Sequence, residues 1–160
     1  MAIKTGEKIP SVTLRYMADD GIKEITTDEL FGGKKVVLFA LPGAFTPTCS
    51  TKHVPGFLGN AAAIRAKGVD TIACVSVNDA FVMGAWAADQ GTGSEILMLA
   101  DGNGDFTRAV GLELDASGFG MGARSQRYAM IVNEGIVTSL AVEDGPGLDV
   151  SAAEKILGQL

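Results

Sequence analysis

The residues best suited to chemistry lie in segment 42–49, which reads PGAFTPTC. The apolar run 36–41 before it predicts a buried strand, and a long helical stretch follows. Pro47 suits the first helical turn, so we expect Cys49 in that turn, where free backbone N–H groups and the helix dipole favour an anion. An accessible thiolate beside hydrogen-bond donors reacts with peroxides. The segment therefore predicts a peroxide-reactive cysteine rather than a small, inert core residue.

Thr46 is the first candidate donor, because it stands three residues before Cys49 and its hydroxyl can return over the helix start. A thiol–disulfide oxidoreductase with a CxxC motif would carry its first cysteine at this position. The sequence Thr-Pro-Thr-Cys cannot form that disulfide, so it favours chemistry on a single sulfur.

Two further side chains are candidates for a role beside Cys49. His53 lies four residues later and would share its helix face, so a Cys–His dyad is conceivable, although a structural role in the turn before Pro55 is favoured. Cys74 falls within the expected strand 71–77, where a packed, inert cysteine is favoured and a resolving cysteine is the alternative.

The segment PGAFTPTC and its continuation STKHVPGF resemble the active-site segment of peroxiredoxins, in the branch of the plant type II enzymes and peroxiredoxin 5. The resemblance continues through SVND at 76–79, FVM at 81–83, Trp86 and RSQRY at 124–128, and covers essentially the whole chain. It implies a thioredoxin-like fold and a thiol-dependent peroxidase that needs no metal, haem or flavin.

The resemblance also implies a role for each matching residue. Cys49 would attack the terminal peroxide oxygen and become a sulfenic acid, while Thr46 hydrogen-bonds the peroxide. Pro42 and Thr48 would contact the substrate, with Pro42 shielding the thiolate from water. The arginine that the family holds over the thiolate matches Arg127, whose guanidinium could also stabilise charge on the departing oxygen.

Several consequences of the resemblance concern partners and neighbours. Arg124 is less favoured than Arg127 as the arginine over the thiolate, and we expect it to form a surface or structural ion pair. Phe45 and Phe119 are expected to wall the mouth of the site, which would suit hydrogen peroxide and small alkyl hydroperoxides, and a homodimer near the Phe45 loop is implied.

The reductant follows from a departure from the family pattern. Some relatives resolve the sulfenate with a cysteine near the C-terminal helix, but residues 147–151 read GLDVS. An external thiol is therefore expected, either glutathione with glutaredoxin or thioredoxin. The principal alternative to an enzyme is a peroxide sensor or redox-regulated chaperone that uses the same cysteine, and turnover would separate the two.

The elements that position these residues are predicted from periodicity and turn signals. A hairpin (12–16 and 22–26) and a short helix opened by the capping box 26–29 precede buried strands at 36–41, 71–77 and 96–100. Helices are expected up to Ala66, over 79–90 with Asn78 as N-cap, and over 106–112. A hairpin (128–132 and 136–142) and a helix opened by a capping box at 151–154 close the chain.

This order predicts one α/β domain over residues 1–160, with a thioredoxin-like mixed central sheet flanked by helices and an N-terminal hairpin extension. The Gly-rich stretch 118–122 is interpreted as a flexible loop, because it lacks the context of a dinucleotide-binding motif.

The bulk composition excludes several classes of function. A net charge of −6 and a pI of about 4.7 disfavour binding to nucleic acid. The sequence also lacks a basic amphipathic segment that could bind a membrane surface. One histidine and two cysteines form no compact set of zinc ligands. The polar start, without the apolar core of a secretory signal, leads us to expect a cytoplasmic protein.

Overall fold

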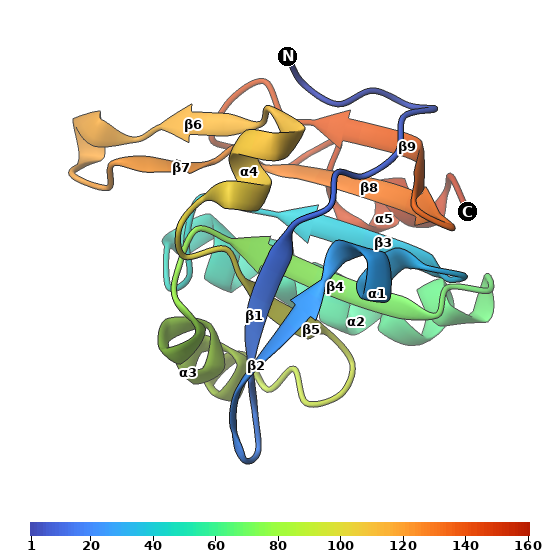
Figure 1. The fold of residues 1–160 in the computed structure, drawn as a ribbon, viewed down its shortest axis with the longest axis horizontal. Helices are drawn as coiled ribbons and strands as arrows, with labels where there is room; N and C mark the ends of the chain where they lie inside the picture. The colour runs from blue at the N-terminus through green and yellow to red at the C-terminus, as the bar shows by residue number, and fades with distance from the viewer.

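The computed structural model describes residues 1–160 and is built around a seven-stranded sheet in the order β2-β1-β5-β4-β3-β8-β9 (Figure 1). A separate pair, β6-β7, projects from one end of it (Figure 1). The strands are β1 Thr13–Ala18, β2 Gly21–Thr26, β3 Lys35–Ala40, β4 Thr71–Ser76, β5 Leu97–Ala100, β6 Glu113–Asp115, β7 Ala123–Ser125, β8 Tyr128–Asn133 and β9 Ile136–Val142.

The centre of the sheet is parallel and its flanks are antiparallel. β3 pairs in parallel with β4, and β4 with β5, while β8 runs antiparallel to β3. β3 and β4 are buried on both faces because their residues are apolar without alternation. β1 pairs with β5, so the N-terminal hairpin continues the sheet at its edge.

Helices cover both faces of the sheet (Figure 1). Val54, Phe57 and Ile64 of α2 (Val54–Ala66) pack on one face together with α3 (Ala80–Gln90) and α5 (Ala153–Leu157). The opposite face is covered by α1 (Thr27–Phe31) and α4 (Asp105–Val110), which contribute Leu30 and Phe106 to a second core. The predicted mixed sheet with flanking helices is confirmed.

Three local predictions were incomplete or wrong. The pair β6-β7 was missed, because two three-residue strands give no periodic signal. Asp79, not Asn78, caps α3 by accepting from the Val82 N–H. Ser151 does not open a capping box; the N-cap of α5 is Ala152, which has no side-chain cap. The first capping box, Thr26 with Glu29, is present as predicted.

None of the helices combines the length and the apolar composition needed to span a membrane.

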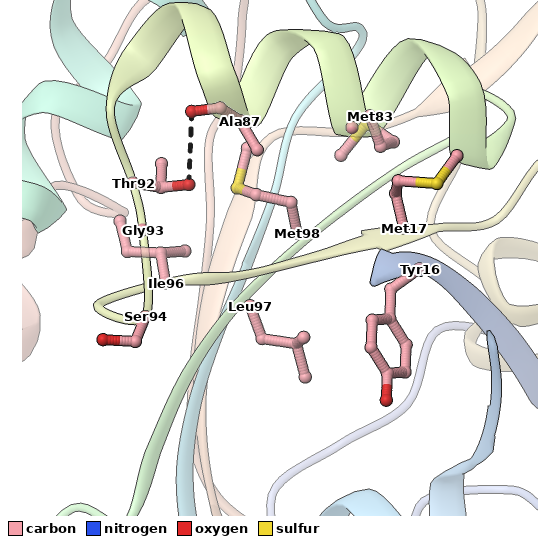
Figure 2. Close-up of a pocket in the computed structure, with 11 residues that line it drawn as sticks. Tyr16, Met17, Met83, Ala87, Thr92, Gly93, Ser94, Ile96, Leu97 and Met98 are labelled. Atoms are coloured by element: carbon pink, nitrogen blue, oxygen red, sulfur yellow. Dashed lines mark hydrogen bonds between the residues drawn. The ribbon is translucent and has the colours of Figure 1, made fainter. Parts of the chain in front are cut away.

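A small cavity of about 150 Å³ lies between α3 and the neighbouring strands, with Met17, Met83 and Met98 around it (Figure 2). Gly84 lets α3 approach β1, because a Cβ at this position would stand 2.8 Å from Cβ of Met17 and 2.9 Å from its Cγ. Such distances are shorter than van der Waals contact, so the close approach depends on the missing side chain.

We expect Gly84→Ala to lower the free energy of unfolding by about 1–3 kcal/mol, the usual cost of overpacking, despite the better helix propensity of alanine. Gly59→Ala in α2 is the matched control: nothing lies within 4 Å of its added Cβ, so it should gain roughly 0.5–1 kcal/mol. Denaturant unfolding measures both, and equal stability of the two variants would contradict the packing argument.

Candidate active site

The predicted helix start is present behind β3, and it includes a π-helical turn. The Ser50 N–H donates to the Thr46 carbonyl at 3.0 Å, which places Cys49 in the first turn. Residues Cys49–His53 then form a π-helix, closed by the Val54 N–H on the Cys49 carbonyl, and α2 continues from there. The expected single regular helix is therefore wider at the functional cysteine, as π-helical turns at functional sites commonly are.

Cys49 is fully buried, with no exposed surface. Its neighbours in the core include Phe39, Phe57 and Cys74. The accessible thiol expected from the sequence is therefore wrong for this conformation. A reactant must reach the sulfur between the side chains that cover it.

Arg127 provides the cation at the sulfur. It directly precedes β8 and is only 5% exposed, and its Nη2 donates to Sγ of Cys49 at 3.3 Å. Its Nε is buried and has no hydrogen-bond partner. Arg124 lies elsewhere: its Nε donates to the Met121 carbonyl and its Nη1 to the Pro42 carbonyl. Arg124 thus has a structural contact, although with carbonyls rather than with the acid expected for an ion pair.

His53 holds the other side of the Arg127 guanidinium. Arg127 Nη1 lies 3.0 Å from His53 Nδ1, and His53 Nε2 lies 3.1 Å from the Ser151 carbonyl. A guanidinium only donates and a carbonyl only accepts, so Nδ1 accepts and Nε2 carries the proton. His53 therefore has no free lone pair for Cys49, which excludes it as the base of a Cys–His dyad in this arrangement.

Burial keeps His53 neutral. Desolvation and then the positive charge of Arg127 lower the pKa of His53 to about 3, and the hydrogen bond to Ser151 and the charge of Glu143 oppose this only in part. A neutral ring with a fixed tautomer can accept from Arg127 without competing for the positive charge.

The segment after β9 fixes the Ser151 carbonyl. Oε2 of Glu143 accepts from the N–H groups of Asp149 and Ser151 and from the Ser151 hydroxyl, each at 2.7–2.8 Å. Burial raises the pKa of Glu143, but these hydrogen bonds outweigh it and leave the pKa below its ordinary value. Sequence reasoning missed Glu143 and assigned Ser151 to a helix cap; only contacts between distant segments reveal their roles.

The loop between β3 and Cys49 is held in a strained shape. Phe45 has a φ of 65°, in the left-handed region that few residues with side chains adopt. Its neighbour Ala44 donates its N–H to Oδ1 of Asn78 at 2.9 Å, and the Thr46 hydroxyl donates to the Gly43 carbonyl at 2.7 Å. Asn78, predicted as a helix cap, instead anchors this loop.

A cavity of about 550 Å³ opens onto the site. Pro42, Thr46, Thr48 and Arg127 all line it, so the structure brings these sequence-predicted residues together. The outer wall comes from the β6-β7 pair, including the Gly-rich turn with Phe119, and from residues 143–146.

Phe119 therefore lines the mouth as expected, but Phe45 does not. The Phe45 ring is 53% exposed and lies 6.3 Å from the Trp86 ring, outside the cavity lining. Trp86, one of the residues that carry the family resemblance, is buried, and its Nε1 donates to the Ser50 hydroxyl beside Cys49.

Comparison with known proteins identifies the family. The Redoxin family model matches residues 4–157. The chain is 52% identical to a chloroplastic peroxiredoxin-2E-2 of Oryza sativa subsp. japonica, over 99% of this chain and 72% of that protein. It is 43% identical to peroxiredoxin-2D of Arabidopsis thaliana, over 99% of this chain and 98% of that one.

The chain belongs to the peroxiredoxins. A crystal structure of reduced Prx3 from Vibrio vulnificus in complex with H₂O₂ is 55% identical, covers 98% of both chains and superposes with a TM-score of 0.94. Peroxiredoxin 5 from Alvinella pompejana is 36% identical with a TM-score of 0.86. The predicted type II branch, the thioredoxin-like fold and the thiol-dependent peroxidase activity are thereby confirmed.

The second cysteine of this peroxiredoxin lies in the middle of β4, between β3 and β5. Cys74 is completely buried and pairs in register with Phe39. Burial and then the proximity of Cys49 raise the pKa of the Cys74 thiol well above its ordinary value. A protonated, buried thiol is a poor nucleophile, as the favoured reading of Cys74 requires.

No group of three or more His, Cys, Asp or Glu side chains is placed to hold a metal ion.

The neutral burial of His53 predicts a particular pH dependence of stability. The pKa of His53 is near 6.5 in the unfolded chain but about 3 in the folded protein. Its contribution to the free energy of unfolding is therefore complete above pH 6.5 and is lost as the pH falls towards 3. As the pH falls from 6.5 to 5, the slope of the free energy of unfolding against pH should approach about 1.4 kcal/mol per pH unit.

His53→Gln keeps a donor and an acceptor without titrating, so its free energy of unfolding should be nearly flat in this window. His53 is the only histidine, and ordinary carboxyls titrate below the window. Denaturant unfolding of both reduced proteins at several pH values measures the difference. Parallel profiles would show that His53 is not buried in its neutral form.

Proposed function

We propose that Cys49 is the residue on which this thiol-dependent peroxidase reduces hydroperoxides. The buried Arg127 guanidinium, 3.3 Å from Sγ, is the observation that carries the proposal, because a buried cation next to a thiol favours the thiolate. The sulfur attacks the terminal peroxide oxygen and the O–O bond breaks. Cys49 becomes a sulfenic acid, and the departing oxygen takes up a proton to leave as water or an alcohol.

Arg127 and Thr46 have distinct roles in this proposal. Nη2 of Arg127 holds the thiolate, while its unpartnered Nε is a donor left for the peroxide oxygens. The Thr46 hydroxyl donates to Gly43, so its oxygen remains an acceptor for the O–H of the hydroperoxide. Pro42 and Thr48 line the cavity and would contact the substrate. Hydrogen peroxide and small alkyl hydroperoxides fit this space.

We infer that an external thiol regenerates Cys49. Both cysteines are free, and Cys74 lies on a central strand that cannot open without much of the global stability. Glutathione with glutaredoxin and thioredoxin remain the two candidate reductants. Parallel turnover assays with each would choose between them, and repeated turnover would also separate an enzyme from a peroxide sensor or chaperone.

Other expectations concern assembly and location. We propose that residues 1–160 act as one domain and that two copies form a homodimer. The exposed rings of Phe45 and Phe81, 53% and 67% exposed, support an apolar contact surface near α3. The cytoplasmic location remains a prediction, because some relatives are chloroplastic proteins.

The two arginines provide a test of the proposed site. Arg127→Gln should slow oxidation of Cys49 by hydrogen peroxide about 10²-fold, the usual loss for a donor that stabilises a transition state. The pH at which Cys49 becomes alkylated by iodoacetamide should also rise. Arg124→Gln, which removes only contacts to carbonyls, is the matched control and should change both far less. A larger effect at Arg124 would reverse the assignment.

The two cysteines provide a second test. Cys49→Ser should lose turnover while keeping its circular dichroism spectrum, whereas Cys74→Ser should retain most thiol-supported activity. Mass spectrometry of the oxidised wild type should find sulfenate or a thiol adduct on Cys49. A Cys49–Cys74 disulfide together with an inactive Cys74→Ser variant would show that Cys74 is the resolving cysteine.

A further inference from the structure

Four acidic residues line the active-site cavity, three of them exposed and Glu143 half-buried. Glu113 and Asp115 come from β6, and Glu143 and Asp144 follow directly after β9, so two separate segments supply them. We call these four residues the acidic collar. Arg127 is the only lysine or arginine among the residues that line the cavity.

No cation lies within salt-bridge distance of the acidic collar, although Arg124 of β7 stands opposite Leu114, between Glu113 and Asp115. None of its four carboxylates takes part in a salt bridge; the ion pairs of the molecule lie elsewhere. Glu143 is held by N–H groups and a hydroxyl, and Asp115 accepts from the Ser117 N–H, contacts that lower the pKa values of both carboxyls. The collar is therefore negative at neutral pH.

The rest of the cavity is suited to an uncharged organic molecule. Leu114, Ala116, Phe119 and Met121 give its lining an apolar part. Arg127 is a poor receptor for an anion along the cavity, because it is only 5% exposed and its Nη1 and Nη2 each already contact a partner, His53 and Cys49. Its Nε is buried without a hydrogen-bond partner, so this N–H remains a donor for the peroxide group of a substrate at the sulfur.

We propose that the acidic collar is a specificity determinant that admits uncharged organic hydroperoxides and rejects those bearing a carboxylate. This inference rests on the proposed role of Cys49. A hydroperoxide that places its O–O bond at Sγ must leave the rest of its molecule along the cavity. A carboxylate on that remainder is repelled by the collar, and walls of low dielectric strengthen the repulsion.

The test compares two substrates that differ in charge and by one methyl group: 4-hydroperoxy-4-methylpentanoic acid and its methyl ester. Single-turnover rate constants for oxidation of Cys49 at pH 7 are measured by stopped flow, with hydrogen peroxide alongside. At about 10 mM ionic strength the ester should react roughly 10-fold faster than the acid, and the ratio should fall to about 2 at 0.5 M salt, where the Debye length is only a few ångström.

Charge-neutralising variants locate the source of the selectivity. Glu113→Gln with Asp144→Asn should lower the ester-to-acid ratio at low salt to about 3, because half of the collar charge is gone. The control is Glu134→Gln in the β8–β9 turn, which removes one exposed charge at the opposite end of β8, roughly 20 Å away, and should leave the ratio unchanged.

Equal rates for acid and ester would overturn the proposal. A ratio that does not respond to salt, or that survives in the double variant, would equally assign the discrimination to shape rather than charge. Failure of the proposed function looks different, since hydrogen peroxide would then leave Cys49 of the wild type reduced.

Discussion

The candidate active site depends on the buried guanidinium of Arg127, which lies against the buried sulfur of Cys49. An isolated charge in a protein interior costs several kcal/mol, so Arg127 needs compensating partners wherever it is enclosed. The structure provides a thiol that can ionise and a neutral imidazole that can accept, and leaves Nε without a partner. Mutual stabilisation of cation and thiolate thus accounts for the tolerance of a charge at this depth, and it is the basis of the reactivity that we propose for Cys49.

The pair and its partners come from three separate parts of the chain. β3 leads into the loop and the π-helical turn with Cys49 and His53, β8 begins next to Arg127, and the segment after β9 supplies Glu143 and Ser151. The order β4-β3-β8-β9 makes β3 and β8 direct neighbours, in the register that pairs Ala40 with Tyr128. The sheet therefore sets the separation of thiol and guanidinium, and the hydrogen bonds from Glu143 through Ser151 and His53 set the orientation of the guanidinium.

What could be predicted from the sequence reflects how local each signal is. The buried strands, the helix start at Pro47 and the position of Cys49 follow from neighbouring residues, and a segment resemblance singled out Arg127. The π-helical turn could not be predicted, because it is distinguished from an α-helix only by where the Val54 N–H bonds. Asn78 and Ser151 looked like helix caps, but contacts with distant segments, Ala44 and Glu143, use their polar groups instead.

Complete burial of Cys49 places two opposing requirements on the structure around it, shielding of the sulfur and access to it. Shielding keeps water from the thiolate, yet a reducing thiol must later reach the oxidised sulfur. Opening a central strand is too costly, but the first turn of a helix unwinds at a fraction of the global stability. A π-helical turn and the left-handed Phe45 weaken the resistance of this segment to opening. Cys49 thus lies on an element that can open locally, and Cys74 on a central strand that cannot, which supports the proposed reduction by an external thiol.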